Sequence, residues 1–223
     1  MNELISKKTG LAVWIVSNCH NMDGARKRMM FFLQLVATGL SVEKRGRCFS
    51  YSSSASQSEK HKIIRNYKFY LSFENQFHCK DYITEKLFVN AYANGVVPVV
   101  YGGAKSDYEE IAPPGSYIFA EEYTPDDLVE YLQYLDRNST AYAEYFKWRT
   151  LHEEDMYDYG RTNGVCQLCR ILHGVNIDNI YNPRYNESYK DIPLFHHPNH
   201  TRVVPSIRDW FYKTERRECL EDY

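Results

Sequence analysis

The chain has no long hydrophobic segment and no surplus of charge of one sign. No stretch reaches the roughly 18 apolar residues of a membrane-spanning helix, and the best candidate, MMFFLQLVATGL, follows three basic residues. The first twenty residues lack the apolar block of a signal peptide. A net charge of −2 gives no general attraction to nucleic acid or to an acidic membrane. As written, the sequence predicts a domain with no membrane anchor of its own.

Several common motifs are also absent, and their absence argues against three enzyme classes. There is no G-x-G-x-x-G of a dinucleotide oxidoreductase, no G-x-x-x-x-G-K-[ST] phosphate loop and no G-x-S-x-G serine elbow. Zinc is an alternative raised by Cys166-x-x-Cys169 together with four later histidines, His173, His196, His197 and His200. A single C-x-x-C without a second pair does not favour zinc, so no metal site is predicted.

The composition that is present is that of a globular domain with features of the secretory pathway. Hydrophobic residues make up 43% of the 223 residues and charged residues 25%, enough to build a core. The aromatic share of 15% fits either core packing or a site for nucleotides and sugars. Six cysteines and three N-glycosylation sequons, at Asn138, Asn186 and Asn199, suit the lumen. Because no route into the lumen is visible, we expect an N-terminal portion beyond this sequence.

Apolar runs alternate with helical patterns along the first two thirds of the chain. Strands are expected at 11–17, 41–46, 67–73, 96–103 and 116–119, although Pro98 argues against a central strand in the fourth. Helices are expected at 24–40, 81–95, 125–137 and 139–158. A polar loop that closes into a short helix is expected at 50–62. Thr124 is the expected cap of the third helix, before Pro125 and two acids. The alternation predicts an α/β fold with a doubly wound parallel sheet.

Polar side chains gather where the strand at 67–73 ends. Asn75 follows the strand, and Tyr82, Glu85, Lys86 and Val89 follow at the spacing of one α-helical face. Ligands of open α/β sheets bind outside the carboxyl ends of the strands, and a helix N-terminus attracts anions. We therefore predict an anion site here. The alternative is a solvated helix face with a surface Glu–Lys pair.

The first strand-to-helix turn has a similar pattern. Ser17 and Asn18 end the strand, and the basic residues 26–28 lie in the first turn of the next helix. Cations there oppose the helix dipole unless an anion such as phosphate is bound. Two such turns, each with a cation and helix N–H groups, together predict a binding site for a pyrophosphate. Simple solvation of one or more of these arginines is the alternative.

Residues 66–148 resemble the donor-binding region of the α-1,3-fucosyltransferases. The resemblance lies in YKFYLSFENQ, DYITEKL, NAYANGVVPVVYGG, DYEEIAPPGSYIF and YFKWR. VSNCHNMDGARKR is similar to that family's first donor-domain turn, and CQLC to its C-terminal cysteine pair. The resemblance implies a Rossmann-like GDP-fucose-binding domain at 10–173, the C-terminal half of a glycosyltransferase-B enzyme. It leaves a linker remnant at 1–9 and an extended tail at 174–223.

The same resemblance implies a reaction and roles for five residues. The family transfers L-fucose from GDP-β-L-fucose, with inversion, to a GlcNAc hydroxyl of a glycan in α-1,3 linkage. Arg26 and Lys86 would bind the pyrophosphate with help from Asn75 and Tyr82. Glu85 would be the catalytic residue, contacting donor hydroxyls or steadying positive charge on the fucose.

The family pattern also places several parts outside this sequence. The acceptor-binding half, the general base and the anchor that would hold the full-length protein in the Golgi all precede residue 10 in the family. The C-x-x-C cysteines would pair with the absent half, which leaves Cys19, Cys48 and Cys79 unassigned. No metal is required, and weak manganese stimulation is compatible with the site. The alternatives are a non-catalytic GDP-sugar-binding module and a structural domain with no affinity for GDP.

Overall fold

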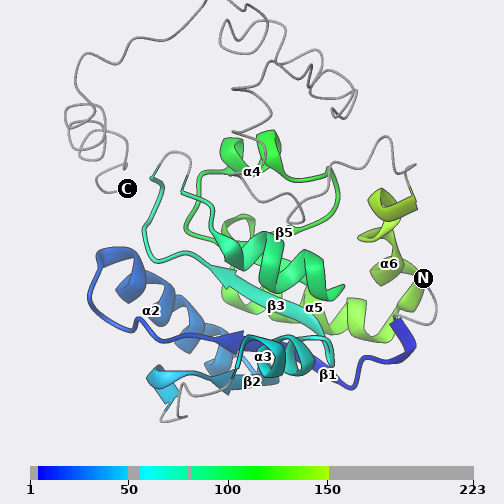
Figure 1. The fold of residues 1–223 in the computed structure, drawn as a ribbon, viewed down its shortest axis with the longest axis horizontal. Helices are drawn as coiled ribbons and strands as arrows, with labels where there is room; N and C mark the ends of the chain where they lie inside the picture. The colour runs from blue at the N-terminus through cyan, green and yellow to red at the C-terminus, as the bar shows by residue number, and fades with distance from the viewer. Residues whose placement is uncertain (1–4, 50–55, 80–81, 151–223) are drawn as a thin grey trace, which may run out of the picture. The chain divides into compact units, whose positions relative to one another are not determined.

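The computed structural model of the protein describes residues 5–49, 56–79 and 82–150, and a parallel sheet lies at the centre of this part of the chain. Every strand pair in the sheet is parallel, and the order is β2-β1-β3-β4-β5 (Figure 1). The strands are β1 (Gly10–Ile15), β2 (Val42–Arg45), β3 (Tyr67–Phe73), β4 (Val97–Tyr101) and β5 (Ile118–Phe119).

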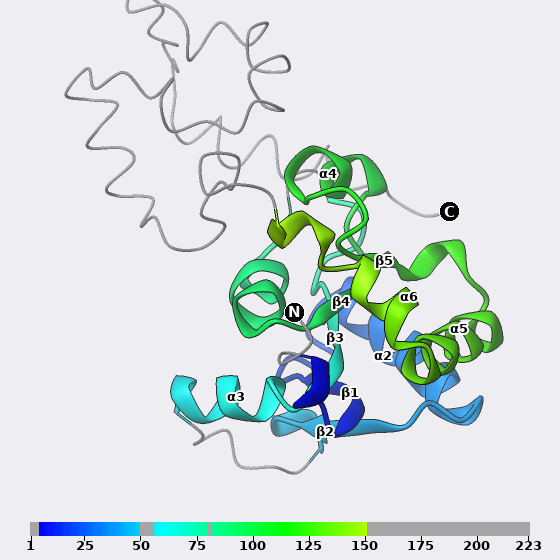
Figure 2. The same cartoon turned by 90° about the vertical axis from the view of Figure 1, so that its right-hand side faces the viewer.

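Helices cover both faces of this sheet. The α-helices are α2 (Asp23–Ala37), α3 (Gln57–Ile64), α4 (Lys105–Ile111), α5 (Pro125–Arg137) and α6 (Ser139–Glu144). A π-helix, η2 (Lys86–Ala91), and four 3₁₀ turns complete the set: η1 (Arg47–Phe49), η3 (Tyr92–Asn94), η4 (Ala120–Glu122) and η5 (Lys147–Thr150). Residues of α2, α5 and α6 share one core cluster, whereas α3, η2 and α4 pack in separate clusters (Figure 2). The predicted doubly wound α/β fold is confirmed.

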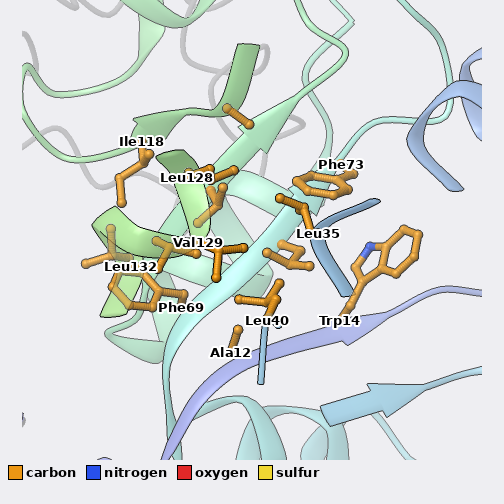
Figure 3. Packing of buried hydrophobic residues seen from close by; sticks show 14 of the residues in the cluster. Ala12, Trp14, Leu35, Leu40, Phe69, Phe73, Ile118, Leu128, Val129 and Leu132 are labelled. Carbon is orange, nitrogen blue, oxygen red and sulfur yellow. The ribbon is translucent and has the colours of Figure 1, made fainter. Parts of the chain in front are cut away.

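Aromatic residues fill the main core near the carboxyl ends of the strands. Trp14 of β1 is buried, with its ring centroid 4.4 Å from that of Phe32 and 5.6 Å from that of Phe73 (Figure 3). Phe31 of α2 stacks on Tyr101 of β4 at 4.5 Å. Offset and tilted aromatic pairs of this kind add to the stabilisation that their buried area provides. Of the two explanations for the aromatic-rich composition, core packing accounts for these residues.

Pro98 is accommodated in β4 although that strand lies between two others. It stands opposite Tyr70 of β3, and β4 pairs with β5 only at Val99 and Val100. On the β5 side, therefore, the ladder has not begun at Pro98, and a missing N–H is tolerated there.

Two predicted helix ends were wrong. The first helix ends at Ala37 rather than Leu40, because Gly39 takes a positive φ of 98°. The last helix ends at Glu144 rather than 158: the chain tightens into i→i−3 hydrogen bonds there, and Phe146 is buried in the main core. Residues 151–158 lie outside the described ranges.

A disulfide joins the exits of β1 and β2. Cys19 bonds to Cys48 of η1; their Cα atoms are 5.6 Å apart, and their sequence separation is 29. Cys79 is disulfide-bonded as well. Disulfides persist in oxidising compartments, which agrees with the sequons. Within the described ranges, no helix has the length and apolar character needed to cross a membrane.

The start of α5 is confirmed and provides a test of the fold. Thr124 Oγ1 accepts the Asp127 backbone N–H at 3.2 Å, and Pro125 opens the helix. We expect Thr124→Ala to lower the free energy of unfolding by about 1 kcal/mol, because the N–H loses its acceptor. Urea denaturation would measure the loss. Thr124→Ser keeps the hydroxyl and should lose much less, so equal losses in both variants would contradict the capping role.

Candidate functional site

A buried carboxylate lies at the carboxyl end of β3. Glu74 directly follows the strand and is 1% exposed. Its Oε1 accepts the backbone N–H of Thr84 at 2.9 Å, and both oxygens lie 2.9 Å from Thr84 Oγ1. Lys86 Nζ donates to Glu74 Oε2 at 2.8 Å and to Thr84 Oγ1 at 2.6 Å. A charged group this far from water is stable only when it is paired and hydrogen-bonded in this way.

A second cation influences the same carboxylate from the first strand-to-helix turn. Arg28 of α2 is 2% exposed, and its Nη1 and Nη2 donate to the carbonyls of Phe73 at 2.6 Å and Asn18 at 2.7 Å. Burial lowers the pKa of Arg28, and the nearby charge of Glu74 opposes that shift. Arg28 thus ties the exits of β1 and β3 together. Glu74, Lys86 and Arg28 together carry one positive charge, which the exposed Glu85 carboxylate, 3.8 Å from Lys86 Nζ, offsets.

The two strand-to-helix turns lie in direct contact. A Cβ added to Gly24, in the first turn of α2, would stand 2.4 Å from the Asn75 carbonyl oxygen and 2.4 Å from the Gln76 carbonyl carbon. Only a residue without a side chain permits this approach. The loop that carries Asn75 therefore lies against the N-terminus of α2.

Arg26 stands at this junction but makes local contacts. Its side chain is 56% exposed and pairs with Asp23, and its Nη1 donates to the His20 carbonyl at 3.0 Å. Among the described residues, no hydrogen bond or ion pair joins Arg26 to Lys86. Of the basic residues 26–28, Arg26 is solvated, which was the alternative to phosphate binding. Arg28 is buried, which neither interpretation predicted.

The expected α-helical face of Tyr82, Glu85, Lys86 and Val89 is wrong. Tyr82 precedes the helix, Glu85 is its N-cap residue, and the helix from Lys86 is a π-helix. Ser72 Oγ of β3 donates to the Lys86 carbonyl at 3.0 Å, so the sheet supplies a partner for a carbonyl at the start of the helix. α-Helical spacing does not describe such a segment. π-Helical turns occur frequently at functional sites.

The structure does bring Asn75 and Tyr82 together. A side-chain hydrogen bond joins them, although six residues separate them in sequence. Burial, followed by the charge of Glu74, raises the pKa of Tyr82, and the bond from Asn75 opposes this. The Tyr82 hydroxyl is therefore protonated at neutral pH and available as a donor.

The remaining predicted positions differ in their surroundings. Glu85 is 59% exposed, with its Oε1 3.8 Å from Lys86 Nζ. Asn138 is the N-cap of α6: its Oδ1 accepts the Ala141 N–H at 3.0 Å, and its Nδ2 donates to the Tyr134 hydroxyl at 3.0 Å. Outside the described residues lie Asn186, Asn199, the C-x-x-C pair and the tail at 174–223.

No group of three or more metal-ligating side chains occurs within residues 5–49, 56–79 and 82–150. A cavity of about 380 Å³ lies between α4 and β5, lined by Lys105, Glu109, Tyr117 and Glu122 among others. None of the five predicted donor-binding residues lines it.

Sequence reasoning gave no role to Glu74 or Thr84 and did not foresee that Arg28 is buried. Glu74 does carry a signal, since it directly follows an apolar strand and precedes T-x-K by ten residues. The residue pattern alone does not show that the position after the strand is still buried.

Comparison with known proteins supports the architecture. An α1,3-fucosyltransferase crystal structure superposes with a TM-score of 0.53 and 23% identity, covering 78% of this chain and 48% of that one. The described residues therefore share the fold of that structure, a Rossmann-like parallel α/β sheet. A profile described as glycosyltransferase family 10 (fucosyltransferase) C-term matches residues 5–190. The chain belongs to this family.

Relatives of known activity agree with the family. The glycoprotein 3-alpha-L-fucosyltransferase A of Drosophila melanogaster is 39% identical over 218 residues, which is 96% of this chain and 40% of that protein. A 3-galactosyl-N-acetylglucosaminide 4-alpha-L-fucosyltransferase of Bos taurus is 35% identical over 93% of this chain and 48% of its own length. The chain spans less than half the length of these curated relatives.

The buried ion pair yields a stability prediction. Glu74→Gln leaves the Lys86 ammonium without its carboxylate, so we expect the free energy of unfolding to fall by about 3 kcal/mol. Glu85→Gln removes a carboxylate that lies near the same ammonium but is exposed, and we expect a change within about 0.5 kcal/mol. Urea denaturation of both variants measures the difference. If both variants lost a similar amount of unfolding free energy, the importance of the Glu74 charge could not be attributed to its burial.

Proposed function

We propose that the chain is the donor-binding part of an inverting α-1,3-fucosyltransferase. It transfers L-fucose from GDP-β-L-fucose to a GlcNAc hydroxyl of a glycan on a glycoprotein or glycolipid. The observation that carries this proposal is the contact between two strand-to-helix turns at the carboxyl edge of the sheet, each of which brings an arginine or lysine. Ligands of open α/β sheets bind at this edge. Membership of the fucosyltransferase family is the reason for proposing GDP-fucose as the donor.

Lys86 and Arg26 bind the diphosphate in this proposal. An ammonium has three N–H donors, and Lys86 uses two of them on Glu74 and Thr84. The third remains for a phosphate oxygen. Arg26 is exposed and lies in the first turn of α2, whose N-terminus has no side-chain cap. A diphosphate would draw its guanidinium from Asp23 and meet the free N–H groups of the helix.

The cations act most strongly on the leaving group. As the bond from the fucose anomeric carbon to the β-phosphate oxygen breaks, GDP gains negative charge and the sugar becomes oxocarbenium-like. Positive groups at the diphosphate therefore bind the transition state more tightly than the ground state. The acceptor hydroxyl attacks the opposite face of the anomeric carbon and gives its proton to a general base. The acceptor site and that base belong to a portion outside this sequence.

Glu85, Asn75 and Tyr82 hold the sugar end of the donor. The exposed Glu85 carboxylate lies 3.8 Å from Lys86 Nζ, so a donor held by Lys86 is within its reach. A carboxylate there accepts hydrogen bonds from sugar hydroxyls and stabilises positive charge on the ring. The linked amide of Asn75 and hydroxyl of Tyr82 add uncharged donors.

Expectations about location, metal and glycosylation complete the proposal. The full-length protein is a Golgi enzyme held by an anchor outside this sequence. Catalysis uses side-chain cations at the diphosphate, so no metal is required, although manganese stimulation is compatible with them. Asn138, Asn186 and Asn199 stay candidate glycosylation sites. A non-catalytic GDP-sugar-binding module is the alternative, and fucose transfer by this polypeptide would eliminate it.

The proposed diphosphate contacts are tested by GDP titration calorimetry. Arg26→Ala and Lys86→Ala should each weaken GDP binding about 10- to 150-fold, the loss of one charge-assisted hydrogen bond worth about 1.5–3 kcal/mol. Arg26 is exposed, so its loss is not a folding effect, whereas Lys86→Ala also leaves Glu74 unpaired and needs a parallel melting curve. Lys105→Ala is the control, a lysine of α4 with surface partners. GDP affinity unchanged in Arg26→Ala would contradict the assignment.

The role of Glu85 is tested by separating binding from transfer. Glu85→Gln keeps a hydrogen-bond acceptor but removes the charge, so we expect the transfer rate to fall at least tenfold while the Kd for GDP changes less than twofold. The assay needs the protein extended by its acceptor-binding portion. Equal losses of GDP affinity and of transfer rate would contradict a catalytic role for Glu85.

A further inference from the structure

His78 has an unusual backbone conformation at the edge of the proposed donor site. Its φ is 51°, and in the part of the chain that the structure describes no other non-glycine residue has a positive φ. Histidine enters the left-handed region more readily than most residues, yet such a conformation is still strained. Surrounding contacts must hold it in place. Strain of this kind clusters at functional sites.

Those contacts join the exits of three neighbouring strands. The His78 backbone N–H donates to the carbonyl of Gly102, which follows β4, at 2.6 Å. Glu121 follows β5, and its Oε1 accepts the Gly102 N–H at 3.0 Å. Its Oε2 lies 2.7 Å from His78 Nε2, and since a carboxylate only accepts, the imidazole carries its proton on that nitrogen. The loop after β3 is thus bound to the exits of both β4 and β5.

The connection also reaches the first strand-to-helix turn. The Phe77 ring stacks on the His78 ring, with centroids 4.0 Å apart, and lies 5.5 Å from Tyr101 of β4. Lys27 Nζ of α2 stands 4.5 Å above the Phe77 ring, a favourable cation–π distance. The segment from Glu74 to His78 is therefore fixed at its start by Lys86 and at its end by Glu121. Asn75 lies between the two fixed points.

We propose that His78 and Glu121 are positioning residues for the donor site. They do not touch the reacting atoms; they hold the segment 74–78 in the geometry that Asn75 and its partner Tyr82 need in order to meet the donor. A loop that is ordered before binding loses less conformational entropy when the ligand arrives, which raises affinity. This inference rests on the proposed function.

The test combines GDP affinity with hydrogen exchange. His78→Asn keeps a residue that tolerates the left-handed backbone, but its shorter side chain does not reach Glu121 as the imidazole does. Glu121→Ala removes the other partner. We expect either variant to raise the Kd for GDP about tenfold and to speed amide exchange across residues 74–78. The double variant should be no worse than Glu121→Ala alone, because that change already breaks the link to His78.

Two controls separate positioning from general stability. Glu121→Gln keeps one oxygen to accept the Gly102 N–H, and its amide NH2 can donate to Nε2 of the other imidazole tautomer, so it should retain most of the affinity. Asp136→Asn breaks the ion pair of Asp136 with Lys68 at 2.8 Å, at the amino end of β3, and should leave GDP affinity unchanged.

Three results would overturn the inference. Slow exchange across 74–78 retained in Glu121→Ala would show that the pair does not order the segment, whatever happens to GDP. Additive losses in the double variant would show that the two residues act separately. Fast exchange with unchanged GDP affinity would show that the segment does not serve the donor. If the unaltered chain binds no GDP at all, the proposed function fails and the positioning role fails with it.

Discussion

The site depends on one buried negative charge that faces two positive ones. Glu74 at the exit of β3 is paired with Lys86 from the following helix and lies in the field of Arg28 from α2. A buried carboxylate without these partners would be too unfavourable to keep, and each cation would be equally costly without the carboxylate. Together with the hydrogen bond from Arg28 to the Phe73 carbonyl, this interaction joins two strand-to-helix units whose strands, β1 and β3, are neighbours in the sheet.

This arrangement has a consequence for any anion that binds there. The Glu74 carboxylate is already bonded to Lys86 and lies in the field of Arg28, so a diphosphate would not fill an empty basic pocket. In the proposed function it would add to an ordered network in which the lysine has one N–H donor left. Because the groups are already oriented, little reorganisation would accompany binding or the change of charge in the transition state.

Sequence reasoning succeeded where a local signal was strong. Alternation of apolar residues predicted β3, the threonine and proline before α5 predicted its start, and a continuous apolar run predicted β1. It failed where backbone conformation depends on distant partners. Lys86 begins a π-helix beside Ser72 of the sheet, and Cys19 pairs with Cys48 through two strand exits, and neither relation leaves a mark in local spacing.

By itself, the sequence determined the alternation of strands and helices, the family, and the presence of an amide, a tyrosine and several charges around two predicted turns. These follow from side-chain type and short-range order, which the chain carries in its local pattern. Only the tertiary structure decided which arginine is buried, which carboxylate meets the lysine, and that His78 adopts a left-handed backbone held by Glu121. Burial and charge pairing depend on residues far apart in sequence, and it is the packed sheet that brings them together.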